Sequence, residues 1–187
     1  RNAGAVIFGE NKIQDAVAKV DELGSKEISW HFIGHLQKNK VKFLGIRFDL
    51  IHSVDSFELA DKIAKHCQSE NRVQSILLQV NVSGEAAKFG MEPGELEKQL
   101  LDFSRLQGIR IEGLMTIPPL DPDPENSRRH FSRLRELRDQ CEKQSGLSLQ
   151  ELSMGMTNDF EVAIEEGATL VRVGTALFGP RTESGDK

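Results

Sequence analysis

Short apolar runs alternate with helical patterns along the whole chain, and this alternation constrains the fold more than any other feature. Seven runs of four to eight residues are rich in apolar and β-branched side chains. Most are too apolar on both faces to border water, which is typical of central strands in a parallel sheet. Repeated strand–helix units predict an α/β fold. The predicted strands are 5–8, 28–33, 50–54, 75–82, 109–115, 149–153 and 170–173.

Between these strands, four stretches repeat apolar residues at the spacing of one helix face. Asp55 or Ser56 is expected to cap the second of these helices. Asn158 and Glu161 form the pattern of a capping box for a further helix that ends at Gly167. The four predicted faces are Ile13, Val17, Val20 and Leu23, closed by Gly24; Leu59, Ile63 and Cys67; Leu96, Leu100, Phe103 and Leu106, after Pro93; and Phe131, Leu134, Leu137 and Cys141.

Seven strand–helix units are one fewer than the closed barrel of eight parallel strands contains, and 187 residues are fewer than such a barrel typically has. The sequence therefore predicts a TIM-type (β/α)8 barrel that lacks its first βα unit, with a single domain over residues 1–187. The chain opens on Arg1 and not on Met, and it enters a predicted strand within five positions. We therefore expect a start that is processed, truncated or located further upstream.

Composition narrows the classes of partner. A net charge of −5 and a pI of about 5.6 disfavour a general nucleic-acid surface. No apolar run is long enough to span a membrane, and no leader pattern opens the chain. Cys67 and Cys141 fall in helical patterns with no second cysteine nearby, which favours reduced thiols. These features predict a cytoplasmic protein whose main partner is a small molecule.

The last two predicted strands each run into a short glycine turn, at Gly155 and Gly174. Glycine lets backbone N–H groups approach an anion closely, and Ser153, Thr157 and Thr175 add hydroxyl groups. A helix that starts after the first turn directs the positive end of its dipole toward the same place. In parallel barrels, the last two strands commonly form a phosphate site. The pair of turns therefore predicts a phosphate-binding cradle.

Arg172 lies in an otherwise apolar strand, two residues before the second glycine turn. Burying a guanidinium is costly unless its N–H groups find acceptors. A salt bridge with Glu151 or Glu10 is one interpretation. An acceptor on a bound ligand is the other, and the sequence alone leaves both open.

Several other polar residues carry weaker signals. His31 and His35 are separated by a predicted strand end and Gly34, without an obvious third ligand, so a metal site is not predicted. Glu10 at a strand end could serve as the general base of a barrel isomerase or aldolase of a phosphorylated sugar, but it has no obvious acid partner in sequence, and a capping or hydrogen-bonding role is favoured. The remaining basic residues are expected to form solvated faces, although the arginine-rich helix could meet an acidic protein partner. These are Lys38, Lys40 and Lys42, and Arg128, Arg129, Arg133, Arg135 and Arg138.

The chain resembles the pyridoxal-phosphate homeostasis proteins of the YggS and PROSC type, which are similar to the barrel domain of alanine racemase without its second domain. The resemblance covers nearly the whole length and rests on six segments in the same order and spacing. These segments are 8–11, 31–40, 81–85 with 88–90, 113–118, 152–156, and 171–175 with 178–179.

The resemblance implies that the chain binds pyridoxal 5′-phosphate (PLP). It places Arg172 opposite the pyridine nitrogen and Asn11 beside the ring. It also implies which residues hold the cofactor phosphate: Ser153, Gly155, Met156, Gly174 and Thr175.

In that family, the Schiff-base lysine lies on the first strand, upstream of the segment that corresponds to residues 8–11. We therefore expect this lysine upstream of Arg1 and predict no catalytic residue within the sequence. The other candidate lysines fall in predicted loops or helices; they are Lys12, Lys38, Lys40 and Lys88. A chain that starts at Arg1 is expected to have an open barrel edge and weakened, noncovalent binding, whereas upstream residues would permit covalent binding.

The predicted function is a PLP-binding protein that carries or buffers the cofactor without strong catalysis. Arginine stays protonated, so a pyridine nitrogen facing Arg172 must accept a hydrogen bond, and the ring is then a poor electron sink. The similar racemases use a tyrosine base from a second domain, and this chain contains no tyrosine. A weak amino-acid racemase is the first alternative. Apo-enzymes that receive PLP are the expected partners, and the lack of a second domain favours a monomer.

Overall fold

The computed structural model describes residues 4–23, 27–45, 47–85 and 87–179. In this part of the chain, seven parallel strands form one sheet in which spatial order follows sequence order. The strands are β1 (Ile7–Glu10), β2 (Ser29–Phe32), β3 (Leu50–Val54), β4 (Gln74–Gln79), β5 (Ile109–Met115), β6 (Glu151–Met156) and β7 (Leu170–Arg172).

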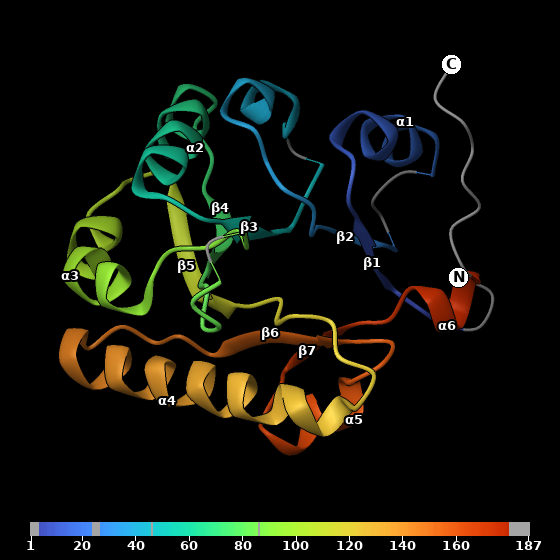
Figure 1. Ribbon diagram of the computed structural model, residues 1–187. Helices are drawn as coiled ribbons and strands as arrows, with labels where there is room; N and C mark the ends of the chain where they lie inside the picture. Colours follow the sequence, from blue (N-terminus) through green and yellow to red (C-terminus); the bar gives the residue numbers. More distant parts are fainter. Residues whose placement is uncertain (1–3, 24–26, 46, 86, 180–187) are drawn as a thin grey trace.

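The sheet curves into a nearly closed barrel with helices around its outside (Figure 1), so the predicted TIM-type architecture with seven strands is confirmed. The helices are α1 (Ile13–Leu23), α2 (Phe57–Ser69), α3 (Pro93–Ser104), α4 (Arg128–Ser145), α5 (Phe160–Glu165) and α6 (Thr175–Phe178), with 3-10 turns η1 (Lys38–Phe43) and η2 (Pro124–Ser127).

The strand predictions differ from the structure mainly at the ends. The bounds of β3 and β5 are those predicted. Strand β4 stops at Gln79, and Val80 forms only an isolated bridge with Met91. Strand β6 runs on through Gly155 to Met156, so this glycine lies inside a strand and not in a turn after it. The pairing of β6 with β7 shifts register between Ser153 and Met156, which accommodates the glycine conformation.

Apolar side chains between the strands and the helices form the main hydrophobic cluster, called here the outer core. The predicted faces of α2, α3 and α4 are buried in it, because their spacing keeps them on one side of each helix; the exception is Leu106, which lies beyond the end of α3 and is partly buried. In α1, Ile13 and Val20 are buried, Val17 is partly buried and Leu23 is exposed, so the predicted face is correct only in part. Gly24, predicted to close this helix, lies outside the described residues.

The two predicted helix caps have different outcomes. The Ser56 hydroxyl accepts a hydrogen bond from the Leu59 N–H at 3.3 Å, which confirms it as the cap of α2. The predicted capping box of α5 is wrong. The N-cap is Asp159, and the Asn158 amide instead donates to the Asp121 carbonyl at 2.9 Å. The helix ends at Glu165, two residues before the predicted Gly167.

The inner face of the barrel is partly polar. A small separate cluster contains Leu50, Leu77 and Met115. Side chains alternate across each strand, so on β3 the residue that shares the inner face with Leu50 is His52. By the same alternation, Ser153 on β6 lies on the opposite face from the outer-core residues on either side of it. Both His52 and Ser153 are buried.

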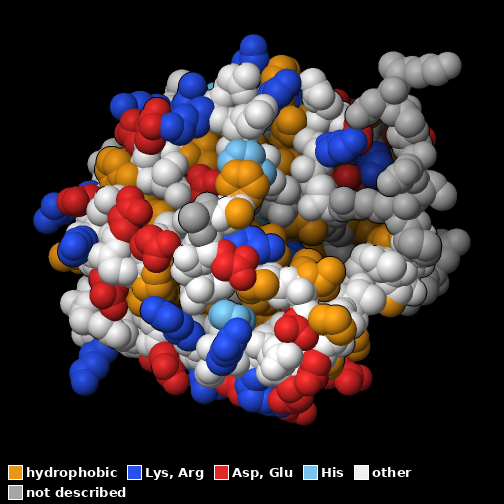
Figure 2. Space-filling model, viewed as in Figure 1, with side chains coloured by type: hydrophobic (Ala, Val, Ile, Leu, Met, Phe, Trp, Pro, Cys, Tyr) orange, Lys and Arg blue, Asp and Glu red, His pale blue; other side chains and the backbone are white. Residues whose placement is uncertain are grey.

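Strands β1 and β7 lie at the two ends of the sheet order, and each pairs on one side only within the described residues. Ile7 of β1 and Val171 of β7 are exposed at these edges. No helix in the described ranges combines the length and the apolar character that crossing a membrane requires. Figure 2 shows acidic and basic side chains interspersed over the face in view.

Candidate functional site

Arg172 ends β7 with its guanidinium held by two neutral acceptors. It donates to the Ser153 hydroxyl oxygen at 2.6 Å and to the Thr116 carbonyl at 2.9 Å. Neither predicted salt-bridge partner contacts it. Glu10 pairs with Lys19 at 2.7 Å, and Glu151 accepts a hydrogen bond from Thr169. The salt-bridge interpretation is therefore wrong for these two carboxylates.

Burial lowers the pKa of Arg172 to about 10, although the charge of Asp159 acts in the opposite direction. The guanidinium therefore stays cationic at neutral pH. Neutral oxygens satisfy some of its five N–H groups, and among the described contacts no carboxylate accepts a hydrogen bond from it, which favours an anion or a strong acceptor beside it. The ion pair of Glu10 with Lys19 also leaves the predicted general-base role of Glu10 without support.

The segments after β6 and β7 meet through a threonine. The Thr157 hydroxyl oxygen lies 3.3 Å from the Gly174 N–H nitrogen and 3.4 Å from that of Ala176, and it accepts from both. Thr175 is the first residue of α6. The backbone N–H groups at this point therefore converge on one oxygen, the arrangement in which a phosphate oxygen is bound.

The two predicted glycines serve different purposes. Gly155 has a φ of +88°, and a Cβ there would lie 2.5 Å from the Cβ of Ala163 in α5, so only glycine permits this approach of strand and helix. A Cβ at Gly174 would meet nothing within 4 Å, which leaves room for a ligand. The Met156 N–H is already used, because it donates to the Asp159 carboxylate at 2.7 Å.

Of the predicted site residues, the structure brings Ser153 to Arg172 and places Gly174 and Thr175 at the Thr157 contact. Asn11 is exposed just after β1. Its carbonyl oxygen would lie only 1.9 Å from a Cβ at Gly34, so this segment packs closely against the end of β2. Among the described contacts, none joins Asn11 to Arg172. The anchoring lysine expected upstream of Arg1 concerns residues outside this sequence and stays a prediction.

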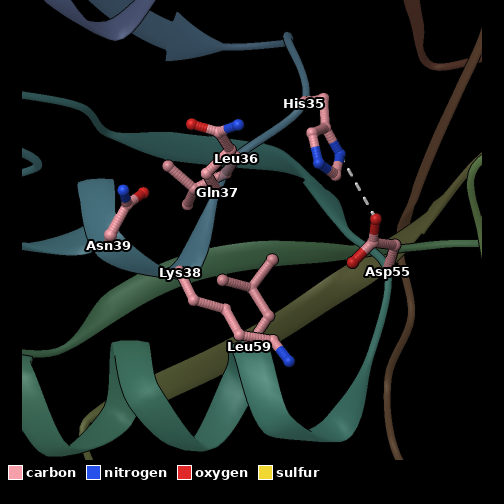
Figure 3. A pocket seen from close by; sticks show the side chains of 7 residues that line it. All are labelled: His35, Leu36, Gln37, Lys38, Asn39, Asp55 and Leu59. Atoms are coloured by element: carbon pink, nitrogen blue, oxygen red, sulfur yellow. Dashed lines mark ion pairs between the residues drawn. The ribbon is translucent and has the colours of Figure 1, made fainter.

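His31 and His35 lie in different surroundings. His31 is buried, and its Nδ1 lies 3.0 Å from Nε2 of His52. His35 stacks on Phe89 with ring centroids 4.1 Å apart. Its Nδ1 also lies 3.5 Å from the Asp55 carboxylate, the ion pair drawn in Figure 3. In the described residues, no three His, Cys, Asp or Glu side chains group as a metal site.

The His35–Asp55 pair borders a cavity of about 450 Å³ between the end of β2, η1 and α2. Figure 3 shows the imidazole turned toward the carboxylate, with Lys38 and Leu59 on the helical side. Lys38 is paired with Glu58 on the surface of α2. None of the residues predicted to hold a ligand lines this cavity.

Sequence reasoning missed His52, which is buried on β3 and lies 2.8 Å from the Ser153 hydroxyl. A signal for it exists: His31 and His52 are the third residues of two consecutive strands, in otherwise mainly apolar surroundings. Burial, His31 and Arg172 together lower the pKa of His52 to about 2, and burial also lowers the pKa of His31. Both imidazoles are therefore neutral at physiological pH.

The arginine-rich helix α4 uses much of its charge within the chain. Arg128 pairs with Glu125, Glu165 and Glu166, and Arg135 pairs with Glu166. Arg138 pairs with Asp139 on the same helix, so it is not available as a free cation either. These ion pairs connect α4 to η2 and α5, and they reduce the charge that α4 can offer to an acidic partner.

Known proteins resemble nearly the whole chain. The profile of the alanine racemase N-terminal domain family matches residues 1–182. The pyridoxal phosphate homeostasis protein of Aquifex aeolicus is 49% identical over 181 residues, which cover 96% of this chain and 79% of the relative. That of Pseudomonas aeruginosa is 43% identical over 181 residues, which cover 96% and 76%.

Among solved structures, PipY of Synechococcus elongatus with PLP bound superposes with a TM-score of 0.88 at 39% identity, covering 95% of this chain and 84% of PipY. An alanine racemase of Clostridium difficile 630 superposes with a TM-score of 0.79 at 13% identity, covering 98% and 47%, which is a likeness of fold alone. The strand order, the matched length and these identities agree. The chain belongs to the alanine racemase N-terminal domain family, among the pyridoxal phosphate homeostasis proteins.

Proposed function

We propose that this chain binds PLP at the carboxyl end of its barrel and carries or buffers the cofactor. The observation that carries the proposal is Arg172, a half-buried cation with only neutral acceptors, followed in sequence by the N–H groups of Gly174 and Ala176, which converge on one oxygen. PipY was solved with PLP bound, and the similar curated proteins are named for PLP homeostasis. A dianionic phosphate and a basic ring nitrogen are the two acceptors that such a site lacks.

In this proposal, the N–H groups around Gly174 and Thr175 hold the phosphate, and the Thr157 hydroxyl turns to donate to it. Gly155 and Met156 shape the neighbouring bend of β6, Ser153 holds the guanidinium, and Asn11 borders the ring. Whether Ser153 and Met156 also touch the phosphate stays a prediction, since both groups have partners within the chain.

Arg172 would donate to the pyridine nitrogen of the ring. Because a guanidinium cannot accept a hydrogen bond, that nitrogen must be unprotonated. When bound, PLP supplies an aldehyde and a ring that can withdraw electron density. An unprotonated ring withdraws electron density weakly, which favours binding and carrying the cofactor over catalysis with it.

Two features of the residues present disfavour strong catalysis by this chain. It has no tyrosine, and the buried histidines are held neutral among protein partners. We propose a single domain that acts in the cytoplasm as a monomer and delivers PLP to apo-enzymes. The free, buried thiols of Cys67 and Cys141 are compatible with a reducing compartment.

An absorbance titration with PLP and with pyridoxal tests the proposal. PLP should bind saturably and more tightly than pyridoxal, which lacks the phosphate. Arg172→Gln should weaken PLP binding by about tenfold to a hundredfold, since a charge-assisted hydrogen bond contributes roughly 1.5 to 3 kcal/mol. Arg110→Gln is the matched control, because Arg110 is exposed near the amino end of β5.

Equal affinity of the Arg172→Gln and Arg110→Gln variants for PLP would contradict the proposed contact between Arg172 and the cofactor. A racemisation assay with several amino acids addresses the alternative. We expect rates far below those of dedicated enzymes. Turnover typical of an enzyme, roughly 1 to 1,000 per second, would show that the chain is a racemase and not a carrier.

A further inference from the structure

A chain of hydrogen bonds crosses the interior of the barrel to Arg172. It starts at Asp49, whose carboxylate accepts from the Ser29 hydroxyl at 2.7 Å. The Ser29 oxygen lies 3.3 Å from Nε2 of His31, and Nδ1 of His31 lies 3.0 Å from Nε2 of His52. Nδ1 of His52 lies 2.8 Å from the hydroxyl of Ser153, which accepts from Arg172 at 2.6 Å.

This chain of hydrogen bonds connects the two ends of the barrel. Ser29 is the first residue of β2, and Asp49 immediately precedes β3, so both lie at the amino end of the sheet. Arg172 is the last residue of β7, at the carboxyl end where the proposed ligand binds. Asp49 is exposed, whereas His31 and His52 are buried. A surface carboxylate is thus linked through the core to the guanidinium.

The donors and acceptors that each group offers fix the direction of every hydrogen bond in this series. An ionised carboxylate only accepts, so the single proton of Ser29 points to Asp49, and Nε2–H of His31 must donate to Ser29. A neutral imidazole carries one N–H, which leaves Nδ1 of His31 as an acceptor for Nε2–H of His52.

The same argument from donors and acceptors applies to His52, Ser153 and Arg172. Nδ1 of His52 is then an acceptor, so the Ser153 proton must point to it. The Ser153 oxygen is left as an acceptor and takes the N–H of Arg172, as observed. Every member donates to the next, from Arg172 to Asp49.

Electrostatics in the interior agree with neutral rings. Burial lowers the pKa of both imidazoles, and His31 and Arg172 lower that of His52 further. The carboxylates of Asp49 and Glu151 act on His31 in the opposite direction without reversing the effect of burial. A protonated ring would have two donors and would break the ordered sequence of bonds.

We propose that His31 and His52 are positioning residues that lock Ser153 as an acceptor and thereby fix the Arg172 guanidinium in place for its ligand. The role of the two histidines toward PLP rests on the proposed function, but the ordered chain of hydrogen bonds itself does not. It follows that the Ser153 proton is committed to His52. It also follows that a change at Asp49 or Ser29 reaches Arg172 from the far end of the barrel.

The ordered chain is testable without any ligand. In the ¹⁵N-labelled protein at neutral pH, long-range ¹⁵N–¹H correlation should show both rings as neutral Nε2–H tautomers. Among the five histidines, the signals of His31 and His52 can be assigned with His31→Gln and His52→Gln. Ser29→Ala should remove the constraint on the tautomers, so that part of the population carries the Nδ1–H tautomer at both rings. Ser104→Ala, which changes an exposed serine at the end of α3, should leave the tautomers unchanged.

A cationic ring or an Nδ1–H tautomer in the wild-type protein would overturn the ordered chain, as would an unchanged pattern in Ser29→Ala. These outcomes are independent of PLP. The proposed function fails separately, if the wild-type protein does not bind PLP in the titration described above, and the role of the histidines toward PLP then fails with it.

The positioning role is tested by PLP titration of two His52 variants. His52→Phe removes both hydrogen bonds and should weaken PLP binding by about threefold to tenfold and shift the absorption maximum of bound PLP. His52→Gln keeps one donor and one acceptor and should restore most of both. His66→Phe, on α2, is the control. Wild-type affinity and spectrum in a folded His52→Phe variant would overturn the role, as would equal losses in His52→Phe and His52→Gln.

Discussion

The two faces of the barrel sheet are filled in different ways. The outer core between strands and helices is almost entirely apolar, with Phe32, Phe103 and Phe131 among its largest fully buried side chains. Among the described residues, the inner face has a small apolar cluster that contains Leu77, together with the hydrogen-bonded His31 and His52. In many barrels of this type, bulky branched side chains fill the interior in layers.

Because of this difference, one face mainly stabilises the barrel and the other mainly fixes the orientation of polar side chains. Apolar burial in the outer core is non-directional and tolerates any arrangement that keeps volume and contacts. Buried hydrogen bonds on the inner face are directional, and leaving one partner unpaired costs about 1 to 3 kcal/mol. The outer core therefore holds the barrel together, and the inner face orients the groups at its carboxyl end.

The largest expected effect is in the outer core. Phe103 is fully buried on α3 and meets Phe57 edge-on with ring centroids 5.2 Å apart. Phe103→Ala should lower the free energy of unfolding by about 3 to 5 kcal/mol, since it removes apolar contacts and leaves a cavity. Urea unfolding measures the change. Leu101→Ala, at an exposed position of the same helix, should stay within about 0.5 kcal/mol. Similar losses in both variants would contradict the assignment of the outer core.

Adding volume to the outer core should also destabilise the protein. In Gly155→Ala, the new methyl group would lie against Ala163 at a φ that disfavours alanine. We expect a loss of about 2 to 4 kcal/mol from strain and overpacking, measured by urea unfolding. A variant as stable as the wild type would show that β6 and α5 can move apart.

The inner face should instead respond to pH. Because the pKa of His52 falls from 6.5 in the unfolded chain to about 2 in the fold, the unfolded state binds more protons below pH 6.5. The contribution of His52 is complete above that pH and is lost as pH falls toward 2. The stability difference between wild type and His52→Phe should therefore shrink by about 2 kcal/mol from pH 7 to pH 5.

Urea unfolding at several pH values measures this difference. Phe103→Ala provides the contrast, because an outer-core variant should keep the wild-type dependence on pH. A constant gap between wild type and His52→Phe would mean that His52 is not held neutral in the fold.

The smallest effect on stability is expected at the carboxyl end. Gly174 has an ordinary negative φ and open space around its Cα. Gly174→Ala should change the free energy of unfolding by no more than about 0.5 kcal/mol. Its added methyl group should nevertheless weaken PLP binding in the absorbance titration. A large loss of stability would show that the space beside Gly174 is part of the packing.

Much of the fold follows from local patterns. The strand–helix rhythm predicted seven parallel strands, and the apolar spacing of α2, α3 and α4 predicted which faces are buried. Helix ends were harder, because the N-cap residue of α5 is Asp159 and not Asn158. The Asp159 side chain makes no cap hydrogen bond, and its carboxylate accepts instead from the Met156 N–H and the Ser127 hydroxyl, contacts that the local sequence pattern does not show.

The sequence by itself determined the barrel and the place of Arg172, because the alternation of apolar runs and the cost of a charge in an apolar strand are local properties. Only the tertiary structure decided what surrounds that charge. Ser153 and His52 lie 101 residues apart in sequence, and their contact depends on the register of neighbouring strands and on the closing curve of the sheet. The alternating faces of separate strands bring polar residues together inside the barrel, and this relation cannot be read from any one strand.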